Sequence, residues 1–309
     1  MEAKKIASTM SRVVGGESKN AIEYDGFKWV VGDTVGSNIE YMYDLNDLIN
    51  YSHLFIKQIM KNENRDIDNI ALSMPTEAYY SSKMKENGGL IKKMEAEIRK
   101  NIPGVNEIVV LPQGASALNY LVSQKKIDLN NGNVLIIDGG FNTLNISVVD
   151  ENGKILFTES IHDELGVYNL LNKFFREELK NKHDEVSSNI QMLKKVFLEE
   201  EIEAGFTTIN VKNEKIRAIQ AFIPKLISRV TRDVKKEKIS FGQFAFVGGI
   251  SYYIKDENIK TTKKFYIPEK GGEYMTVLGM RETVGKDFDV FDIGFGDSKY
   301  ILKNIKKEK

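Results

Sequence analysis

The chain has 309 residues, of which 41% are hydrophobic and 28% are charged, so it is long enough to form two domains with hydrophobic cores. Lys plus Arg and Asp plus Glu both number 44, and this balance excludes a broad positive field that would hold nucleic acid or an anionic membrane directly. The chain has no cysteine and only three scattered histidines, which excludes disulfides and argues against soft-metal sites.

The first residues, "MEAKKIASTM", lack the apolar core of a signal peptide. No uninterrupted apolar run approaches the roughly 20 residues needed to cross a bilayer. We therefore expect a cytoplasmic protein that neither enters a membrane nor binds DNA directly.

Strand-like and helix-like patterns alternate over the first hundred residues. Strands are predicted at 4–14, 21–33 and 67–75, the second with a hairpin turn at Asp25-Gly26. Apolar residues at helical spacing predict a helix over 44–62, which begins behind a capping aspartate, and a more polar helix over 81–101.

The alternation continues through the rest of the chain. Strands are predicted at 106–112, 133–140, 143–150 and 154–160, followed by helices at 164–180 and 185–204. A strand at 206–211, a helix at 214–235, a strand at 244–249 and the segment 275–285 complete the pattern. Alternation of this kind predicts α/β layers with mixed sheets.

Two stretches share a strand-turn-strand pattern with an aspartate at the end of the first strand. They are "NVLIIDGGFNTLNISVVD" and "DVFDIGFGDSKYIL". The corresponding residues are Asp138, Gly139, Gly140 and Thr143 in the first stretch, and Asp292, Gly294, Gly296, Ser298 and Lys299 in the second. Glycines in such a turn let backbone N–H groups converge on phosphate oxygens.

The aspartates and the lysine suggest a Mg²⁺–phosphate site. Asp138 and Asp292 could hold Mg²⁺ through its waters, because this ion keeps much of its hydration shell and favours carboxylates. Lys299 could reach a β-phosphate. The alternative is that each stretch is an ordinary hairpin in which Asp and Gly merely suit the turn.

Further motifs accompany the two turns, and together they resemble those of the actin-like ATPase superfamily. "DIGFGDSK" is similar to its first phosphate loop, "DGGFNT" to its second and "FAFVGGIS" to its adenosine loop. "VVLPQGASAL" resembles the first segment that connects the two domains, and "GEYMTVLGM" more loosely resembles the second. The resemblance implies an α/β, ribonuclease H-like two-domain ATPase fold, with residues 1–125 and 272–309 in one domain and 126–271 in the other.

The order of these motifs is rotated. In the superfamily the first phosphate loop begins the chain, whereas here it comes last, and residues 4–33 resemble what should follow it. We therefore predict a circular permutation, natural or engineered, with both termini between neighbouring strands of one sheet, where a cut is tolerated.

Within the superfamily, the chain most resembles plasmid-segregation actins of the ParM type and their archaeal relatives. This resemblance implies ATP (or GTP) binding with Mg²⁺, polymerisation with bound nucleotide and hydrolysis in the filament. The implied partners are further copies of the chain and a ParR-like adaptor protein bound to centromere-like plasmid DNA. A non-polymerising nucleotide-binding scaffold and a small-molecule kinase remain as alternatives.

The resemblance also assigns residues. Gln113 and Asp138 take catalytic roles, Gln113 by orienting the attacking water, and Asp292 and Asp138 hold Mg²⁺ through water. The implied nucleotide-binding residues are Gly294, Phe295, Gly296, Asp297, Ser298, Lys299, Gly139, Gly140, Phe141, Asn142, Thr143, Gly166, Glu203, Gly248, Gly249 and Ile250.

Several of these residues have structural alternatives. Gln113 could simply start a helix beside Pro112, and Gly166 could be a helix-start glycine. Gly248 and Gly249 could serve tight packing, and Glu203, at the end of an acidic helix, could belong to a solvated face. Asn145 and the Met275-Thr276 pair depart from the residues that the superfamily often has there.

Overall fold

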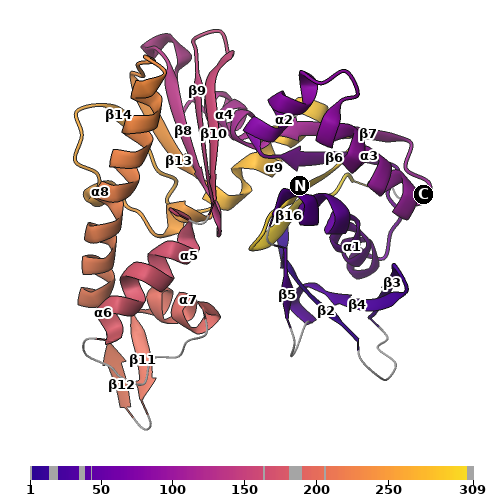
Figure 1. Ribbon diagram of the computed structural model, residues 1–309, viewed down its shortest axis with the longest axis horizontal. Helices are drawn as coiled ribbons and strands as arrows, with labels where there is room; N and C mark the ends of the chain where they lie inside the picture. The colour runs from indigo at the N-terminus through magenta and orange to yellow at the C-terminus, as the bar shows by residue number, and fades with distance from the viewer. Residues whose placement is uncertain are drawn as a thin grey trace. The chain divides into compact units, whose positions relative to one another are not determined.

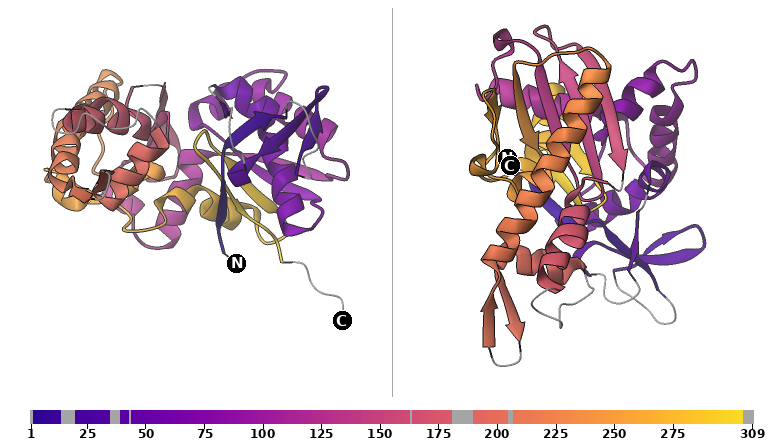
Figure 2. Two further views of the ribbon diagram at one scale, coloured as in Figure 1. Left: turned by 90° about the horizontal axis from the view of Figure 1, so that it is seen from below. Right: turned by 60° about the vertical axis from the view of Figure 1, so that its left-hand side comes forward.

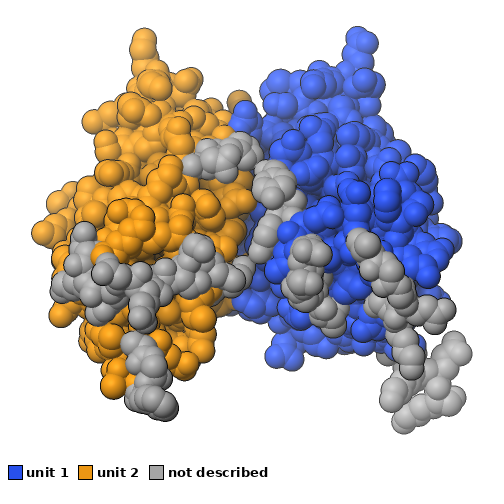
Figure 3. All heavy atoms as spheres, turned by 60° about the horizontal axis from the view of Figure 1, so that its bottom comes forward, with its two compact units in different colours: residues 1–127, 274–309 blue, residues 128–273 orange. Residues whose placement is uncertain are grey.

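The computed structural model describes residues 2–13, 20–34, 39–42, 44–162, 164–180, 190–204 and 207–304. The chain divides into two compact units, coloured separately in Figure 3. Unit 1 comprises residues 1–127 and 274–309, and unit 2 comprises residues 128–273.

A five-stranded mixed sheet forms the centre of unit 1. Its strands, in spatial order, are β1 (Lys4–Ala7), β16 (Asp297–Ile301), β15 (Asp289–Ile293), β6 (Asn69–Met74) and β7 (Glu107–Pro112). β16 runs antiparallel to both of its neighbours, β1 and β15, whereas β15, β6 and β7 are parallel. The first strand that the structure describes therefore pairs with the last, and Lys4 lies opposite Tyr300.

The predicted strand over 4–14 is two strands in different sheets. After β1, β2 (Thr9–Arg12) joins a small sheet with β3 (Ile22–Tyr24), β4 (Phe27–Val31) and β5 (Glu40–Tyr41). The division falls at the buried Ser8, whose N–H donates to the Gly296 carbonyl at 3.0 Å. The Ser8 and Ser298 hydroxyls lie 2.8 Å apart, so Ser8 holds β1 against the loop before β16.

Two further local predictions in unit 1, a hairpin turn and a helix cap, are confirmed. Asp25 and Gly26 both adopt positive φ, 50° and 75°, which makes the tight hairpin turn between β3 and β4. Helix α1 (Leu45–Glu63) begins behind Asp44, whose carboxylate accepts from the N–H groups of Asn46 and Asp47.

The prediction of one continuous helix over 81–101 is wrong. This stretch is divided between α2 (Thr76–Lys83) and α3 (Gly89–Asn101). Gly88 and Gly89 adopt φ of 69° and 50°, and this left-handed backbone cannot continue a right-handed helix. The remaining α-helices that the structure describes in unit 1 are α4 (Gln113–Ser123) and α9 (Met275–Val284).

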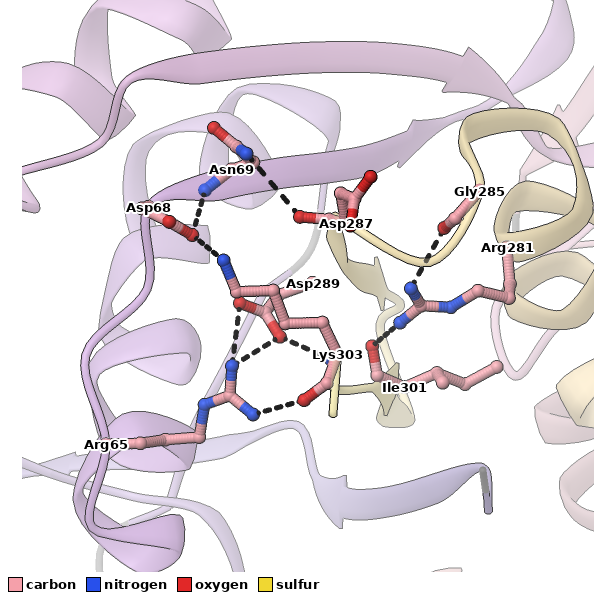
Figure 4. A network of polar contacts seen from close by, with 9 residues as sticks. All are labelled: Arg65, Asp68, Asn69, Arg281, Gly285, Asp287, Asp289, Ile301 and Lys303. Carbon is pink, nitrogen blue, oxygen red and sulfur yellow. Dashed lines mark hydrogen bonds and ion pairs between the residues drawn. The ribbon is translucent and has the colours of Figure 1, made fainter. Parts of the chain in front are cut away.

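A buried ion pair ties the end of the chain to the middle of unit 1 (Figure 4). Arg65 donates to both carboxylate oxygens of Asp289, at 3.0 and 3.2 Å, and to the Lys303 carbonyl at 2.7 Å. The backbone N–H of Lys303 also donates to Asp289 at 2.7 Å, and the side-chain ammonium of Lys303 contacts Asp68. The start of β15 and the segment after β16 are thereby held beside the α1–β6 connection.

Unit 2 has a second five-stranded sheet with the same pattern of directions. Its order is β10 (Ile155–His162), β9 (Thr143–Val149), β8 (Val134–Gly139), β13 (Gln243–Val247) and β14 (Lys264–Tyr266). The first three strands are antiparallel, and β8, β13 and β14 are parallel. Every residue of β8, β9 and β13 is buried, because both faces of the sheet are covered.

The helical part of unit 2 follows β10. It contains α5 (Val167–Asn169), a π-helical turn (Leu170–Phe175), α6 (Arg176–Lys180), α7 (Ile190–Glu199) and the long α8 (Lys212–Lys236). The hairpin of β11 (Glu201–Ala204) and β12 (Thr207–Asn210) extends beyond the helices, as Figures 1 and 2 show. The predicted helix over 185–204 is therefore wrong at its end, because Glu200 adopts φ of 62° and the chain turns into a strand.

No helix within the described ranges is both long and apolar enough to cross a bilayer.

Candidate functional site

Three side chains meet at the carboxyl end of β15 in unit 1. Asp292, at the end of this strand, is only 5% exposed. Its Oδ1 accepts hydrogen bonds from Ser73 Oγ at 2.5 Å and from Gln113 Nε2 at 2.9 Å. Lys299 Nζ lies 4.0 Å from Asp292 Oδ2, so an ammonium adjoins the same carboxylate.

The sheet explains this convergence. Because β15, β6 and β7 are parallel neighbours, their carboxyl ends lie at one edge, where ligands of α/β sheets commonly bind. Ser73 stands near the end of β6, and Gln113 is the first residue of the helix that follows β7. The structure thus brings together Gln113, Asp292 and Lys299.

Sequence analysis did not single out Ser73. The available signal was a serine in "ALSMP", a polar residue at the end of an otherwise apolar strand. Its importance depended on knowing that β6 lies directly beside β15, and this pairing joins residues more than 200 positions apart.

The predicted loop residues 294–298 contact their own sheet closely. Gly296 and Ser298 both contact Ser8, while Asp297 lies 3.8 Å from the Lys5 ammonium. Phe295 is buried in the core of unit 1. A Cβ on Gly294 would lie 3.1 Å from the Asp297 carbonyl and 3.3 Å from Lys299 Nζ, which makes this a compact turn.

The corresponding turn in unit 2 is packed through backbone. The Gly140 N–H donates to the Thr143 carbonyl at 2.8 Å and closes the turn that contains Phe141 and Asn142. A Cβ on Gly139 would lie 2.4 Å from Ile250 Cγ2, and one on Gly248 would lie 2.3 Å from Asp138 Oδ1. The segments 138–143 and 248–250 therefore lie against each other, with Gly249 at their contact.

Gly166 lies on the other side of the same turn. The N–H groups of Val167 and Tyr168 donate to the carbonyls of Gly140 and Phe141, at 3.1 and 2.8 Å. A Cβ on Gly166 would lie 2.4 Å from the Phe141 carbonyl oxygen, so only glycine fits here without a shift of backbone. Most of the predicted unit 2 residues are thus gathered around one turn.

Solved structures of actin homologues share this architecture. The archaeal actin homologue Ta0583 matches over 90% of this chain and 92% of its own, with a TM-score of 0.69 and 15% identity. This chain has an actin-like fold. Ta0583 in complex with ADP gives a TM-score of 0.68 at 14% identity, covering 90% of this chain and 91% of that one.

Two filament structures share the actin-like fold. The 15-stranded ParM filament from Clostridium botulinum has a TM-score of 0.59 at 15% identity, covering 90% of this chain and 91% of its own. The Alp12 filament has a TM-score of 0.53 at 17% identity, covering 89% and 87%. No protein-family model and no curated protein sequence matches the chain. The predicted α/β actin-like fold is confirmed by these structural matches.

Glu203 lies apart from the glycine-rich turns of the actin-like unit 2. It is exposed on β11, opposite Thr208, in the hairpin that extends beyond α6 and α7. The prediction that it ends a helix is wrong. Within the described ranges, no hydrogen bond or ion pair joins it to residues 138–143 or 248–250.

A close helix pair joins the two segments that resemble the connections between actin-like domains. Helices α4 and α9 cross where a Cβ on Gly279 would lie 1.7 Å from the Ser116 carbonyl oxygen. Met275 and Thr276, where the superfamily often has smaller residues, are both buried at the start of α9. Gly279, which sequence analysis did not assign, provides the small surface in this pair.

The carboxylates suit a hydrated Mg²⁺ better than a metal caged by protein. Among the described residues, no group of three or more His, Cys, Asp or Glu side chains could hold a metal ion. Mg²⁺ keeps several waters and is typically bound by one or two carboxylates together with substrate phosphates. In unit 1, Asp292 provides such a carboxylate, held in place by Ser73 and Gln113. In unit 2, Asp138 is another carboxylate of the kind that Mg²⁺ favours.

Proposed function

We propose that this protein is a nucleotide-dependent filament-forming ATPase or GTPase that hydrolyses its nucleotide on polymerisation. The observation that carries the proposal is the cluster of Asp292, Ser73 and Gln113, with Lys299 beside it, at the carboxyl edge of the unit 1 sheet. These groups match the needs of phosphoryl chemistry, namely a carboxylate for hydrated Mg²⁺, a cation for phosphate and a polar group that orients water. The ADP bound to Ta0583 and the filaments of ParM and Alp12 support it.

Gln113 has the role of orienting water. A glutamine amide has both donor and acceptor atoms but is a poor general base at neutral pH. Its hydrogen bond to Asp292 places it beside the proposed Mg²⁺ carboxylate. Hydrolysis should therefore be slow until assembly improves the geometry around the attacking water.

Each unit contributes groups suited to nucleotide binding in this proposal. In unit 1, Asp292 and Lys299 suit the metal and phosphates, and the turn at 294–298 offers N–H groups. In unit 2, Asp138 and the turn at 138–143 offer a carboxylate and N–H groups, and Gly248, Gly249 and Ile250 suit the nucleoside. Asp292→Asn and Asp138→Asn should each weaken Mg²⁺-dependent nucleotide binding, whereas Asp66→Asn, on an exposed aspartate of unit 1, should not. Unchanged Mg²⁺-dependent binding in either of the first two variants would contradict the proposed role of that carboxylate.

Light scattering and phosphate release test the function together. ATP or GTP with Mg²⁺ should raise scattering, and phosphate should follow without an added acceptor, while EDTA should prevent hydrolysis. Nucleotide binding without scattering would favour a non-polymerising scaffold. Phosphate transfer only to an added small molecule would favour a kinase.

The cellular role in this proposal is plasmid DNA segregation in the cytoplasm through a ParR-like adaptor. The equal numbers of acidic and basic residues, 44 each, give filaments no general attraction for DNA. Filaments formed with nucleotide should therefore pellet without plasmid DNA when no adaptor is present. Co-pelleting of DNA with the filaments alone, at physiological salt, would contradict the indirect mechanism.

A circular permutation accounts for the order of the strands in unit 1. It is supported by the pairing of β1 with β16 and by unit 2, where the matching strands β8, β9 and β10 run consecutively. Met1 and residues 305–309 themselves lie outside the described residues. The connection at Gly285–Asp287 is where the usual order would begin.

Rearrangement of the chain tests the permutation. A linker of about six Gly/Ser residues, reaching on the order of 12–15 Å, should join Lys309 to Met1. Reopening the chain between Gly285 and Asp287 would then restore the usual order. Because loop closure changes stability slowly with length, the product should fold with similar stability and bind nucleotide. A rearranged protein that only aggregates would count against the permutation.

A further inference from the structure

Unit 2 contains a largely apolar cavity of about 950 Å³ between α8 and one face of its sheet. Figure 2 (right) shows α8 crossing this face. Apolar side chains from several elements line the cavity, among them Leu135, Ile137, Ile223, Ile227, Phe244 and Ile259. They belong to β8, α8, β13 and the segment before β14, so the walls are part of the folded core.

The connection between β13 and β14 explains why space remains here. In unit 1 the corresponding connection, between β6 and β7, carries α2 and α3, and α3 packs against α1. In unit 2, residues 248–263 are all described and contain only short 3₁₀ turns at 249–252 and 256–258. Among the residues that the structure describes, the flank of α8 therefore has no neighbouring α-helix where α1 has α3.

The rim of the cavity is positively charged. Lys235, Lys260 and Lys263 line it, with Glu257 as the acidic residue. Lys263 Nζ donates to the Phe241 carbonyl at 2.5 Å and lies 4.6 Å from the centre of the Phe241 ring. In the described part of the chain, no ion pair engages the ammonium groups of Lys235 and Lys260, which are exposed.

We propose that this cavity binds a single-chain amphiphile with an anionic head group, such as an alkyl carboxylate. The apolar walls would cover the chain, since burying methylene groups is favourable and a buried charge without a partner is not. The lysines would meet the carboxylate at the solvent edge, where both stay hydrated. The volume lies within the range of about 300–1,000 Å³ that small-molecule sites occupy.

Titration calorimetry with octanoate, decanoate and dodecanoate, each below its micelle concentration, tests the site. We expect one equivalent to bind, with affinity rising roughly three- to fourfold for each added methylene group. Dodecanol should bind several-fold more weakly than dodecanoate, because it lacks the charge. Equal affinity for all three carboxylates, or for dodecanol and dodecanoate, would overturn the proposal.

Two variants separate the cavity from non-specific adsorption. Ile259→Trp should fill the space and reduce dodecanoate binding at least tenfold. Lys235→Glu combined with Lys260→Glu should weaken dodecanoate but leave dodecanol unchanged. Lys154→Glu, on an exposed turn of unit 2 away from the lining, is the matched control and should bind like the wild type.

Circular dichroism and thermal unfolding of each variant establish that it is folded. If Ile259→Trp does not fold, the lysine pair still tests the site, because its residues are exposed and its effect depends on the head group. Undiminished dodecanoate binding in the folded Ile259→Trp protein, or an equal loss in Lys154→Glu, would show that the amphiphile binds elsewhere.

Discussion

The two units arrange their strands in the same way but connect them differently. In unit 2 the antiparallel strands β8, β9 and β10 follow one another along the chain. In unit 1 the corresponding strands are β15, β16 and β1, so β16, the last strand that the structure describes, pairs with the first. The comparison teaches that the strand order of this sheet depends on which strands pair and not on where the chain begins and ends.

The turns at the strand ends also differ in their chemistry. In unit 1 the contacts are made by side chains, because Ser73, Gln113 and Lys299 all surround the Asp292 carboxylate. In unit 2, glycines let backbone segments approach closely around Gly139 and Gly166. Substitutions around Asp292 should therefore mainly change the contacts of this carboxylate. Substitutions at the unit 2 glycines should mainly disturb the packing of the backbone.

Breaking the buried ion pair of unit 1 should have the largest effect. Asp289→Ala leaves the Arg65 guanidinium, whose side chain is 8% exposed, without its carboxylate. The loss of a partner from a buried pair costs about 3–5 kcal/mol of unfolding free energy. Chemical denaturation followed by circular dichroism measures this loss.

The matched control lies in unit 2. Glu177 pairs with Lys180 on the surface, where both side chains are more than half exposed. Exposed pairs contribute roughly 0–1 kcal/mol, so Glu177→Ala should change little. Similar losses in the two variants would show that the Arg65–Asp289 pair does not hold unit 1 together.

Acid should affect unit 1 through His53. Burial in α1, and then the nearby Lys57 charge, lower the pKa of His53 from 6.5 to about 4. The unfolded chain therefore binds a proton between these values that the folded chain does not, and stability falls as pH drops from 6.5 to 4. The loss should reach about 3 kcal/mol, since one pKa unit corresponds to about 1.36 kcal/mol.

His53→Phe should remove most of this pH dependence. The ring of His53 packs 4.3 Å from that of Tyr24, centre to centre, and phenylalanine retains an aromatic contact without a titrating group. Denaturation at several pH values between 4 and 7 compares the two proteins. A variant that loses stability as steeply as the wild type over this range would exclude His53 as the source.

Gln113→Ala should separate hydrolysis from binding. Removing the amide should slow phosphate release by ~10²-fold, the low end of what a positioned proton-handling group supplies. Nucleotide binding and assembly should stay nearly intact, and filaments should persist longer. Gln124→Ala, at the other end of α4, is the control, and unchanged release in Gln113→Ala would make Gln113 a structural residue.

A pair of glycine substitutions compares the two turns directly. Gly139→Ala places a Cβ 2.4 Å from the fully buried Ile250, and overpacking of this kind typically costs about 1–3 kcal/mol. Gly294→Ala meets its nearest neighbours at 3.1 and 3.3 Å and should cost less. Thermal unfolding measures both losses of stability. A larger loss in Gly294→Ala than in Gly139→Ala would contradict the contrast between the two turns.

Local sequence determined much of the architecture. The Asp25-Gly26 hairpin and the Asp44 cap were predicted because each depends on the backbone preferences of a few adjacent residues. The glycine-rich turns after two apolar strands, taken together with the segments similar to the adenosine loop and the domain connections, predicted the actin-like fold that the structural matches confirm.

Tertiary structure decided what depends on distant partners. The stretch 4–14 divides at Ser8 because Gly296 and Ser298, near the other end of the chain, bind it there. Ser73 joins the Asp292 cluster only because β6 pairs with β15. Periodicity and turn chemistry act over a few residues and are visible in the sequence, whereas strand pairing between distant segments depends on the complete packed sheet.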